Sequence, residues 1–207
     1  MFNKNHIPDL YRKMNKLGYL DYFSKHYIWM YEMEWMPYKE VMNYKYEEDM
    51  TKEVLPFAFT GGGDLWAFIE NGTSHPHIGR YYHPEEDGEY CAKNFEDAIL
   101  LDIIEFACSS SVLLNENGEA VSEIFSEQQI VCYLKEYYKV YQGLLCQEYL
   151  DIIEYLSNLH FKKCSFHSSH WLALLSDGEA DVMINRYLNF PKMGQPVVWY
   201  STDKDDF

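Results

Sequence analysis

The segment from residue 55 to residue 68 constrains the fold of this chain more than any other. It reads Leu-Pro-Phe-Ala-Phe-Thr-Gly-Gly-Gly-Asp-Leu-Trp-Ala-Phe, with two apolar runs on either side of a glycine-rich turn. Strand side chains alternate between two faces, so each run presents its large apolar side chains on a single face. Glycine adopts positive φ at a chain reversal without strain, and a short carboxylate can bond turn amides. The segment therefore predicts a β-hairpin that closes at Gly61, Gly62, Gly63 and Asp64.

Three consecutive glycines also suggest a phosphate-binding loop. Such a loop needs a Lys-Ser/Thr pair after the glycines and a helix whose N-terminus faces the phosphate. Here the glycines are followed by Asp64-Leu65-Trp66, where another strand-like run begins. The pattern therefore favours a structural turn over a nucleotide site.

The rest of the N-terminal half alternates between helical and strand-like patterns. Asn94 is a good N-cap for a helix, because acidic residues follow it in the first turn. The other expected elements are a helix over 9–25, an aromatic-faced strand over 27–35, a helical turn over 38–43, and strands near 78–82 and 90–92. This order predicts an α+β fold with a mostly antiparallel sheet of about five or six strands packed with helices.

The C-terminal half is predicted to be mainly helical. Ser126 and Gln129 have the spacing of a capping box, and apolar residues follow at helical spacing to about residue 160, with Gly143 as a kink or break. The polar run 115–118 is the expected domain boundary. We expect a core domain over 1–114 and a helical extension over 119–207 that packs on it. If the wide apolar face is not covered in this way, it would form a homodimer contact.

Three motifs around the hairpin resemble those of one family. They are Pro56-Phe57-Ala58-Phe59 with the glycine turn, Glu34-Trp35-Met36-Pro37 before it, and the run Ala-Lys-Asn-Phe-Glu-Asp-Ala-Ile over 92–99. This combination resembles the SUKH superfamily, which contains bacterial immunity proteins related to the fungal cell-wall-assembly regulators. The resemblance covers residues 20–110 and assigns the turn Gly61–Asp64 to the family motif, where we expect a structural role. The Leu-Pro and Asn-Gly pairs that often open the family do not occur before residue 34.

The resemblance implies a cytoplasmic, non-catalytic immunity protein that binds and neutralises a toxin of a contact-dependent or polymorphic toxin system. The charge agrees with a basic, nuclease-type toxin as the partner. Seventeen basic residues stand against 33 acidic ones, a formal net charge of −16. Such a surface repels nucleic acid and anionic membranes, and it competes with phosphates for the basic groove that a nuclease must carry.

The candidate partner-binding residues combine charge with aromatic anchors, since Tyr and Trp anchor many interfaces. The chain holds 19 Tyr and 5 Trp. The candidate carboxylates are Glu32, Glu34, Glu85, Glu86 and Asp87, and the candidate anchors are Trp29 and Tyr31.

Two other classes of function stay open. An intracellular scaffold or regulatory module would bind several endogenous partners without a toxin. A zinc enzyme would use His160, Cys164, His167 and His170, which lie within eleven positions and are all zinc-capable. The Lys-Lys and Ser-Ser pairs among them favour solvated histidines and a buried cysteine, so we predict no metal site, no cofactor and no catalytic residues.

Neither a targeting segment nor a membrane span is expected, because no run of about eighteen apolar residues occurs. The five cysteines are widely spaced and odd in number, which is typical of reduced, buried cysteines in a cytoplasmic protein.

Overall fold

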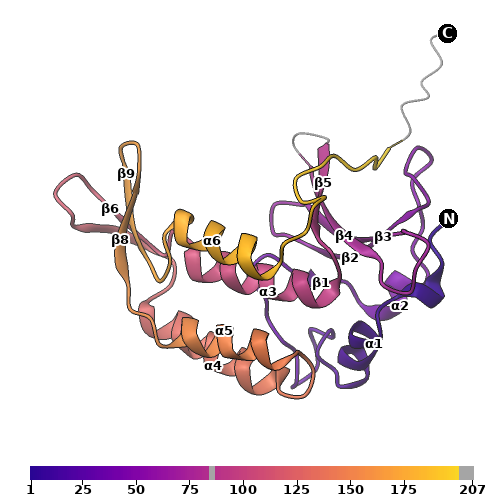
Figure 1. Ribbon diagram of the computed structural model, residues 1–207, viewed down its shortest axis with the longest axis horizontal. Coiled ribbons are helices and arrows are strands. Elements are labelled where there is room, and N and C mark those ends of the chain that lie inside the picture. Colours follow the sequence, from indigo (N-terminus) through magenta and orange to yellow (C-terminus); the bar gives the residue numbers. More distant parts are fainter. Residues whose placement is uncertain (84–86, 201–207) are drawn as a thin grey trace, which may run out of the picture. The chain divides into compact units, whose positions relative to one another are not determined.

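A computed structural model describes residues 1–83 and 87–200 (Figure 1). Two antiparallel sheets and six α-helices confirm the predicted α+β class. The chain divides into two compact units, which are residues 1–99 together with the C-terminal residues from Phe190, and residues 100–189.

The first unit is built on a five-stranded antiparallel sheet in the order β1-β2-β3-β4-β5. Its strands are β1 (Glu34–Trp35), β2 (Val54–Phe59), β3 (Leu65–Ile69), β4 (His77–Tyr82) and β5 (Asp87–Ala92). Its helices are the 3-10 helix η1 (Lys4–His6), α1 (Asp9–Lys16), α2 (Tyr38–Met42) and the start of α3 (Phe95–Cys108), which continues into the second unit. Five strands agree with the predicted sheet.

The predicted hairpin is β2 and β3. Phe59 pairs with Leu65 across it, and the N–H of Thr60 donates to the carbonyl of Asp64 at 2.9 Å. Gly63 has a φ of +93°, the left-handed conformation for which glycine is suited. The Asp64 carboxylate accepts from the Thr60 hydroxyl at 3.2 Å and from the backbone N–H of His83 at 3.1 Å. Asp64 therefore ties its own turn to the end of β4.

A cluster of aromatic rings forms the core beside this sheet. Phe57 and Phe68 stack with ring centroids 4.3 Å apart, and Phe95 meets both rings edge-on at 5.4 and 5.8 Å. Tyr11 from α1 packs on the same three rings. All four side chains are fully buried, so the hairpin, α1 and the start of α3 are held by one continuous aromatic contact.

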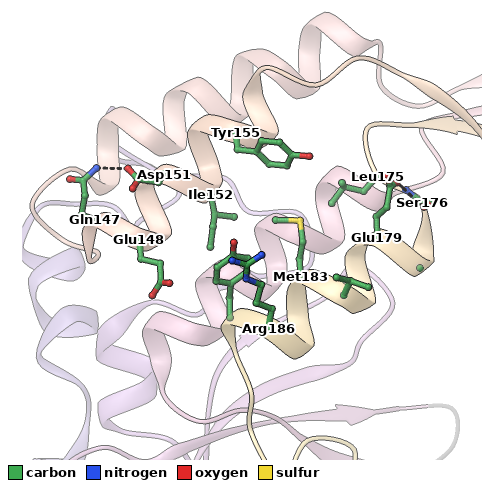
Figure 2. A pocket seen from close by; sticks show the side chains of 13 residues that line it. Gln147, Glu148, Asp151, Ile152, Tyr155, Leu175, Ser176, Glu179, Met183 and Arg186 are labelled. Carbon is green, nitrogen blue, oxygen red and sulfur yellow. Dashed lines mark hydrogen bonds between the residues drawn. The ribbon is translucent and has the colours of Figure 1, made fainter.

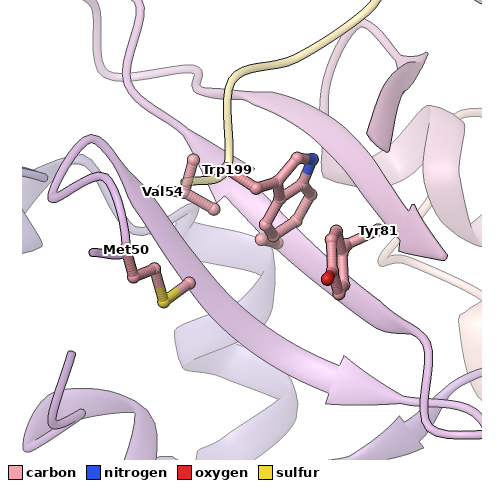
Figure 3. Packing of buried hydrophobic residues seen from close by; sticks show 5 residues of the cluster. Met50, Val54, Tyr81 and Trp199 are labelled. Atoms are coloured by element: carbon pink, nitrogen blue, oxygen red, sulfur yellow. The ribbon is translucent and has the colours of Figure 1, made fainter. Parts of the chain in front are cut away.

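The C-terminal segment covers the free edge and the second face of the same sheet. Gly194 and Val197 donate their N–H groups to the carbonyls of Tyr90 and Gly88 on β5, both at 2.8 Å. Trp199 then packs with Val54 and Tyr81, as Figure 3 shows. A Cβ at Gly88 would lie 1.8 Å from Nε1 of Trp199, so only glycine fits under this indole ring.

We predict that Gly88→Ala displaces Trp199 and lowers the free energy of unfolding by about 1–3 kcal/mol, the usual cost of overpacking a core. Urea denaturation followed by tryptophan fluorescence measures both effects. Gly178→Ala is the matched control, because a Cβ there meets no atom within 4 Å. Equal stability of Gly88→Ala and the wild type would contradict the packing of Trp199.

The second unit has a four-stranded antiparallel sheet in the order β7-β6-β9-β8 and three further helices. Their bounds are β6 (Val112–Leu114), β7 (Ala120–Glu123), α4 (Glu127–Tyr141), α5 (Gln147–Ser157), β8 (Lys162–Phe166), β9 (Ser169–Ala173) and α6 (Asp177–Tyr187). The predicted capping box of Ser126 and Gln129 opens α4, and Gly143, with a φ of +71°, separates α4 from α5.

Several predicted elements differ from the structure. The helix expected over 9–25 ends at Lys16, because Gly18 turns the chain with a φ of +79°. The strand expected over 27–35 is wrong except at Glu34–Trp35. In that segment Ile28, Met30, Met33 and Trp35 are all buried, which is not a two-residue alternation.

The second sheet was not predicted, and the compact units divide elsewhere than at 115–118. That run is the turn of the β6–β7 hairpin, in which the Asn115 side chain accepts from the N–H groups of Asn117 and Glu119, each at 2.9 Å. The same polar composition serves a tight turn and a linker, which is why the sequence suggested a boundary there.

Candidate binding surfaces

Two of the carboxylates predicted to bind a partner, Glu34 and Asp87, lie at the same end of the five-stranded sheet. Glu34 pairs with Phe59 at the end of β2, and Asp87 pairs with Tyr82 at the end of β4. The Gly61–Asp64 turn closes at the same end. Glu34 and Asp87 belong to opposite edge strands, and neighbouring strands lie about 4.8 Å apart, so about 19 Å of sheet separates them. Glu85 and Glu86 lie outside the described residues.

The segment that carries Trp29, Tyr31 and Glu32 is fixed by two buried indoles. The Nε1–H of Trp35 donates to the carbonyl of Ile28 at 2.9 Å, and that of Trp66 donates to the carbonyl of Glu32 at 2.8 Å. Trp29, Tyr31 and Glu32 are themselves half-buried. The two predicted anchors are therefore less accessible than other aromatic residues of the same unit.

The most exposed aromatic side chains of the first unit are Tyr22 and Phe23, which are 76% and 93% exposed. Their rings meet edge-on at 5.6 Å, and Tyr22 also meets the ring of Tyr27 at 5.4 Å. Burial, and next the negative charge of Glu34, raises the pKa of Tyr27. We call Tyr22, Phe23, Tyr27 and Glu34 the aromatic patch.

Two residues in the sequence predict the turn that exposes this patch, although we interpreted 9–25 as a helix. Asp21 is a turn former, and its side chain accepts from the N–H of Phe23 at 3.0 Å. Gly18 ends the preceding helix, so Tyr22 and Phe23 lie on a turn rather than on a helix face. Of the predicted residues, only Glu34 belongs to the aromatic patch.

A groove of about 970 Å³ lies between α5 and α6 in the second unit (Figure 2). Each helix contributes residues at the spacing i, i+3, i+4 and i+7, which is one continuous face. From α5 these are Glu148, Asp151, Ile152 and Tyr155, and from α6 they are Glu179, Val182, Met183 and Arg186. Glu148 lies near the Arg186 end of the groove and Tyr155 near the Leu175 end, so the helices run antiparallel.

The start of α6 is anchored by Glu179. Its carboxylate accepts from Nζ of Lys162 on β8, with both oxygens at 2.7 Å, and it completes a capping box with Ser176. The hydrogen bond from Lys162, followed by those from Ser176, lowers the pKa of Glu179 to about 2. This ionised glutamate therefore sets where α6, and with it one wall of the groove, begins.

The four zinc-capable residues do not form a common cluster. His160 is paired with Glu127 at 2.9 Å, Cys164 is buried on β8, and His167 lies in the β8–β9 turn with a φ of +50°. His170 pairs with Ser165 across that hairpin. Within 1–83 and 87–200, no three His, Cys, Asp or Glu side chains are grouped as metal ligands.

The cysteines are free thiols, as expected, but their burial varies. Cys91 and Cys164 are buried, Cys108 is half-buried, and Cys132 and Cys146 are exposed. Burial as a common property of all five was therefore a wrong prediction. Cys132 lies on α4, and Cys146 is the N-cap residue of α5.

No model of a known protein family, no curated protein and no solved structure matches this chain. The described helices include none with the length and apolar character needed to cross a membrane.

We predict that Glu179→Gln lowers the free energy of unfolding at pH 7 by about 0.5–1 kcal/mol, the range for an exposed ion pair. Glutamine preserves the capping box, so the difference isolates the charge. Because folding lowers this pKa from 4.5 to about 2, the stabilisation is complete above pH 4.5 and is lost as the pH falls toward 2.

Urea denaturation of both proteins at pH 7 and pH 3 tests this expectation. Glu154→Gln is the control, since Glu154 is an exposed glutamate on α5 outside the groove lining. A difference for Glu179→Gln that is the same at both pH values would contradict the ion pair.

Proposed function

We propose that this chain is a non-catalytic, cytoplasmic immunity protein of the SUKH type, which binds and neutralises a basic, nuclease-type toxin. The observation that carries the proposal is the aromatic patch, in which Tyr22 and Phe23 are exposed and their rings meet edge-on. Monomeric proteins seldom leave two adjacent aromatic rings in water without a binding role, and rigid aromatic side chains dominate the energetics of many interfaces.

Charge supports the same kind of partner. The net charge of −16 attracts a basic protein over a long range and raises the rate of encounter at low salt. Glu34 at the aromatic patch and Asp87 at the far edge of the sheet would extend this attraction along the Gly61–Asp64 turn. In this proposal the turn is structural, since Asp64 is engaged by Thr60 and His83.

The partner can be sought by capture from the source cells at low salt, followed by a protection assay. We expect one stoichiometric basic protein with a toxin domain. Expression of that domain should arrest growth, and co-expression of this chain should restore it. Several substoichiometric housekeeping proteins, with no protection, would contradict the toxin proposal and favour the scaffold alternative.

Two aromatic substitutions test the binding surface. Tyr22→Ala combined with Phe23→Ala should weaken binding of the captured toxin by about 30-fold or more, the loss typical of one interface hot spot. Phe166→Ala is the matched control, because Phe166 is a 63% exposed phenylalanine of the other unit. Equal affinity of the double variant and the wild type would exclude the aromatic patch as the contact.

A charge reversal tests the electrostatic part separately. Glu34→Lys should slow association at low salt by about 10-fold and reduce the dependence of the association rate on salt. Glu116→Lys changes the net charge equally at an exposed turn of the second unit, and we expect a smaller effect from it. Stopped-flow measurements at several salt concentrations compare the two, and identical rates for both variants would show that only net charge matters.

A further inference from the structure

The groove between α5 and α6 leaves apolar side chains in water on both of its walls. Tyr155 on α5 is 56% exposed and Val182 on α6 is 66% exposed. Two other lining residues, Ile152 and Leu175, are apolar and buried. At about 970 Å³ the groove is at the upper end of the range for clefts that bind ligands. The second unit therefore presents a concave apolar surface that its described residues leave open to solvent.

We propose that this groove is a second binding site, and that its occupant is an amphipathic helix of another protein with Lys or Arg along its edges. The site lies entirely within residues 147–187, so this inference does not depend on the toxin proposal or on the aromatic patch. It adds a distinct partner-binding function to the second unit.

The shape of the groove favours a helix. Its walls are two antiparallel helices, each offering a face at i, i+3, i+4 and i+7 (Figure 2). A third helix can place its own side chains at the same spacing between these two ridges. The residues that line the groove come from α5, α6 and the segment before α6. They include no open strand edge that could pair with an extended peptide.

The charge of the groove-lining residues indicates which side chains the partner helix should carry along its edges. Three carboxylates line the groove against one cation, Arg186. Glu179 is already paired with Lys162, whereas Asp151 accepts a hydrogen bond from the neutral amide of Gln147 at 2.7 Å, which brings no positive charge to it. Arg186 lies at the same end of the groove as Glu148, so Glu148, Asp151 and this one cation leave that end with a net charge of −1, which favours Lys or Arg on the partner.

A second copy of this chain is a poorer occupant. It would bring the carboxylates of another acidic α5 or α6 toward Glu148 and Asp151, and like charges brought together at an interface cost several kcal/mol. The net charge of −16 adds a general repulsion between copies. The groove therefore favours a basic partner over a homodimer.

Selection from a displayed peptide library tests this proposal with the full-length chain. The probe is a library of helical peptides of about 15 residues, with Leu fixed at i, i+3, i+4 and i+7 and the other positions drawn from Ala, Gln, Glu and Lys. We expect enrichment of Lys over Glu at the positions flanking the leucines. A library with the leucines in scrambled order should yield no binders.

Variants locate the site of the selected peptides. Val182→Lys should weaken the best peptide by about 10-fold or more, as expected for loss of a buried apolar contact. The charge reversal Glu148→Lys with Asp151→Lys should weaken it more at low salt than at high salt. Glu154→Lys, on α5 but outside the groove, should leave the affinity within about 2-fold. Circular dichroism checks that each variant keeps its helices, and Tyr155→Lys serves as a second groove variant.

Several results would overturn the proposal. These are no enrichment over the scrambled library, enrichment of Glu over Lys, or equal binding to Val182→Lys, Tyr155→Lys and the wild type. Self-association in sedimentation experiments that Val182→Lys abolishes would assign the groove to a second copy and would also overturn it.

Discussion

The stacked rings of Phe57 and Phe68 are the contact on which the first unit depends. They come from the two strands of the glycine-turn hairpin, and Tyr11, Phe95 and Trp35 pack around them. Trp35 also donates its indole N–H to the carbonyl of Ile28. This hydrogen bond connects the core to the chain that precedes β1. Burial of this cluster therefore positions the loop that exposes Tyr22 and Phe23.

The two units differ in how their apolar surface is covered. In the first, the segment from Phe190 covers the outer edge of β5 and places Trp199 over Gly88, which leaves the aromatic patch as the main exposed apolar feature. In the second, α6 buries only Ala180 among its own residues, and the groove beside α5 stays open. Each unit thus combines an acidic surface with an exposed apolar area, and that combination supports protein binding in both proposals.

Local signals predicted much of this fold. The hairpin at Gly61–Asp64, the Asn94 cap and the Ser126 capping box all appear as expected, because each depends on residues close in sequence. The strand predicted over 27–35 was wrong outside Glu34–Trp35 because long-range contacts decide that segment: the Trp66 indole holds the carbonyl of Glu32 from 34 residues away. The helix predicted beyond Lys16 was wrong for a local reason, the turn at Gly18. The second sheet also depends on a long-range pairing, since β6 pairs with β9 across more than fifty residues, whereas β8 and β9 form a local hairpin that the prediction missed. Of the predicted site residues, only Glu34 also belongs to the aromatic patch.

Hydrogen exchange of the free chain and of its complex with the captured partner would test the central claim most directly. If the chain binds through the aromatic patch, backbone amides of residues 19–34 should exchange more slowly in the complex, because the partner excludes water there. Amides of the buried strands β2 and β3 serve as an internal reference that exchanges slowly in both states. Protection confined to other parts of the chain, with 19–34 unchanged, would contradict the account.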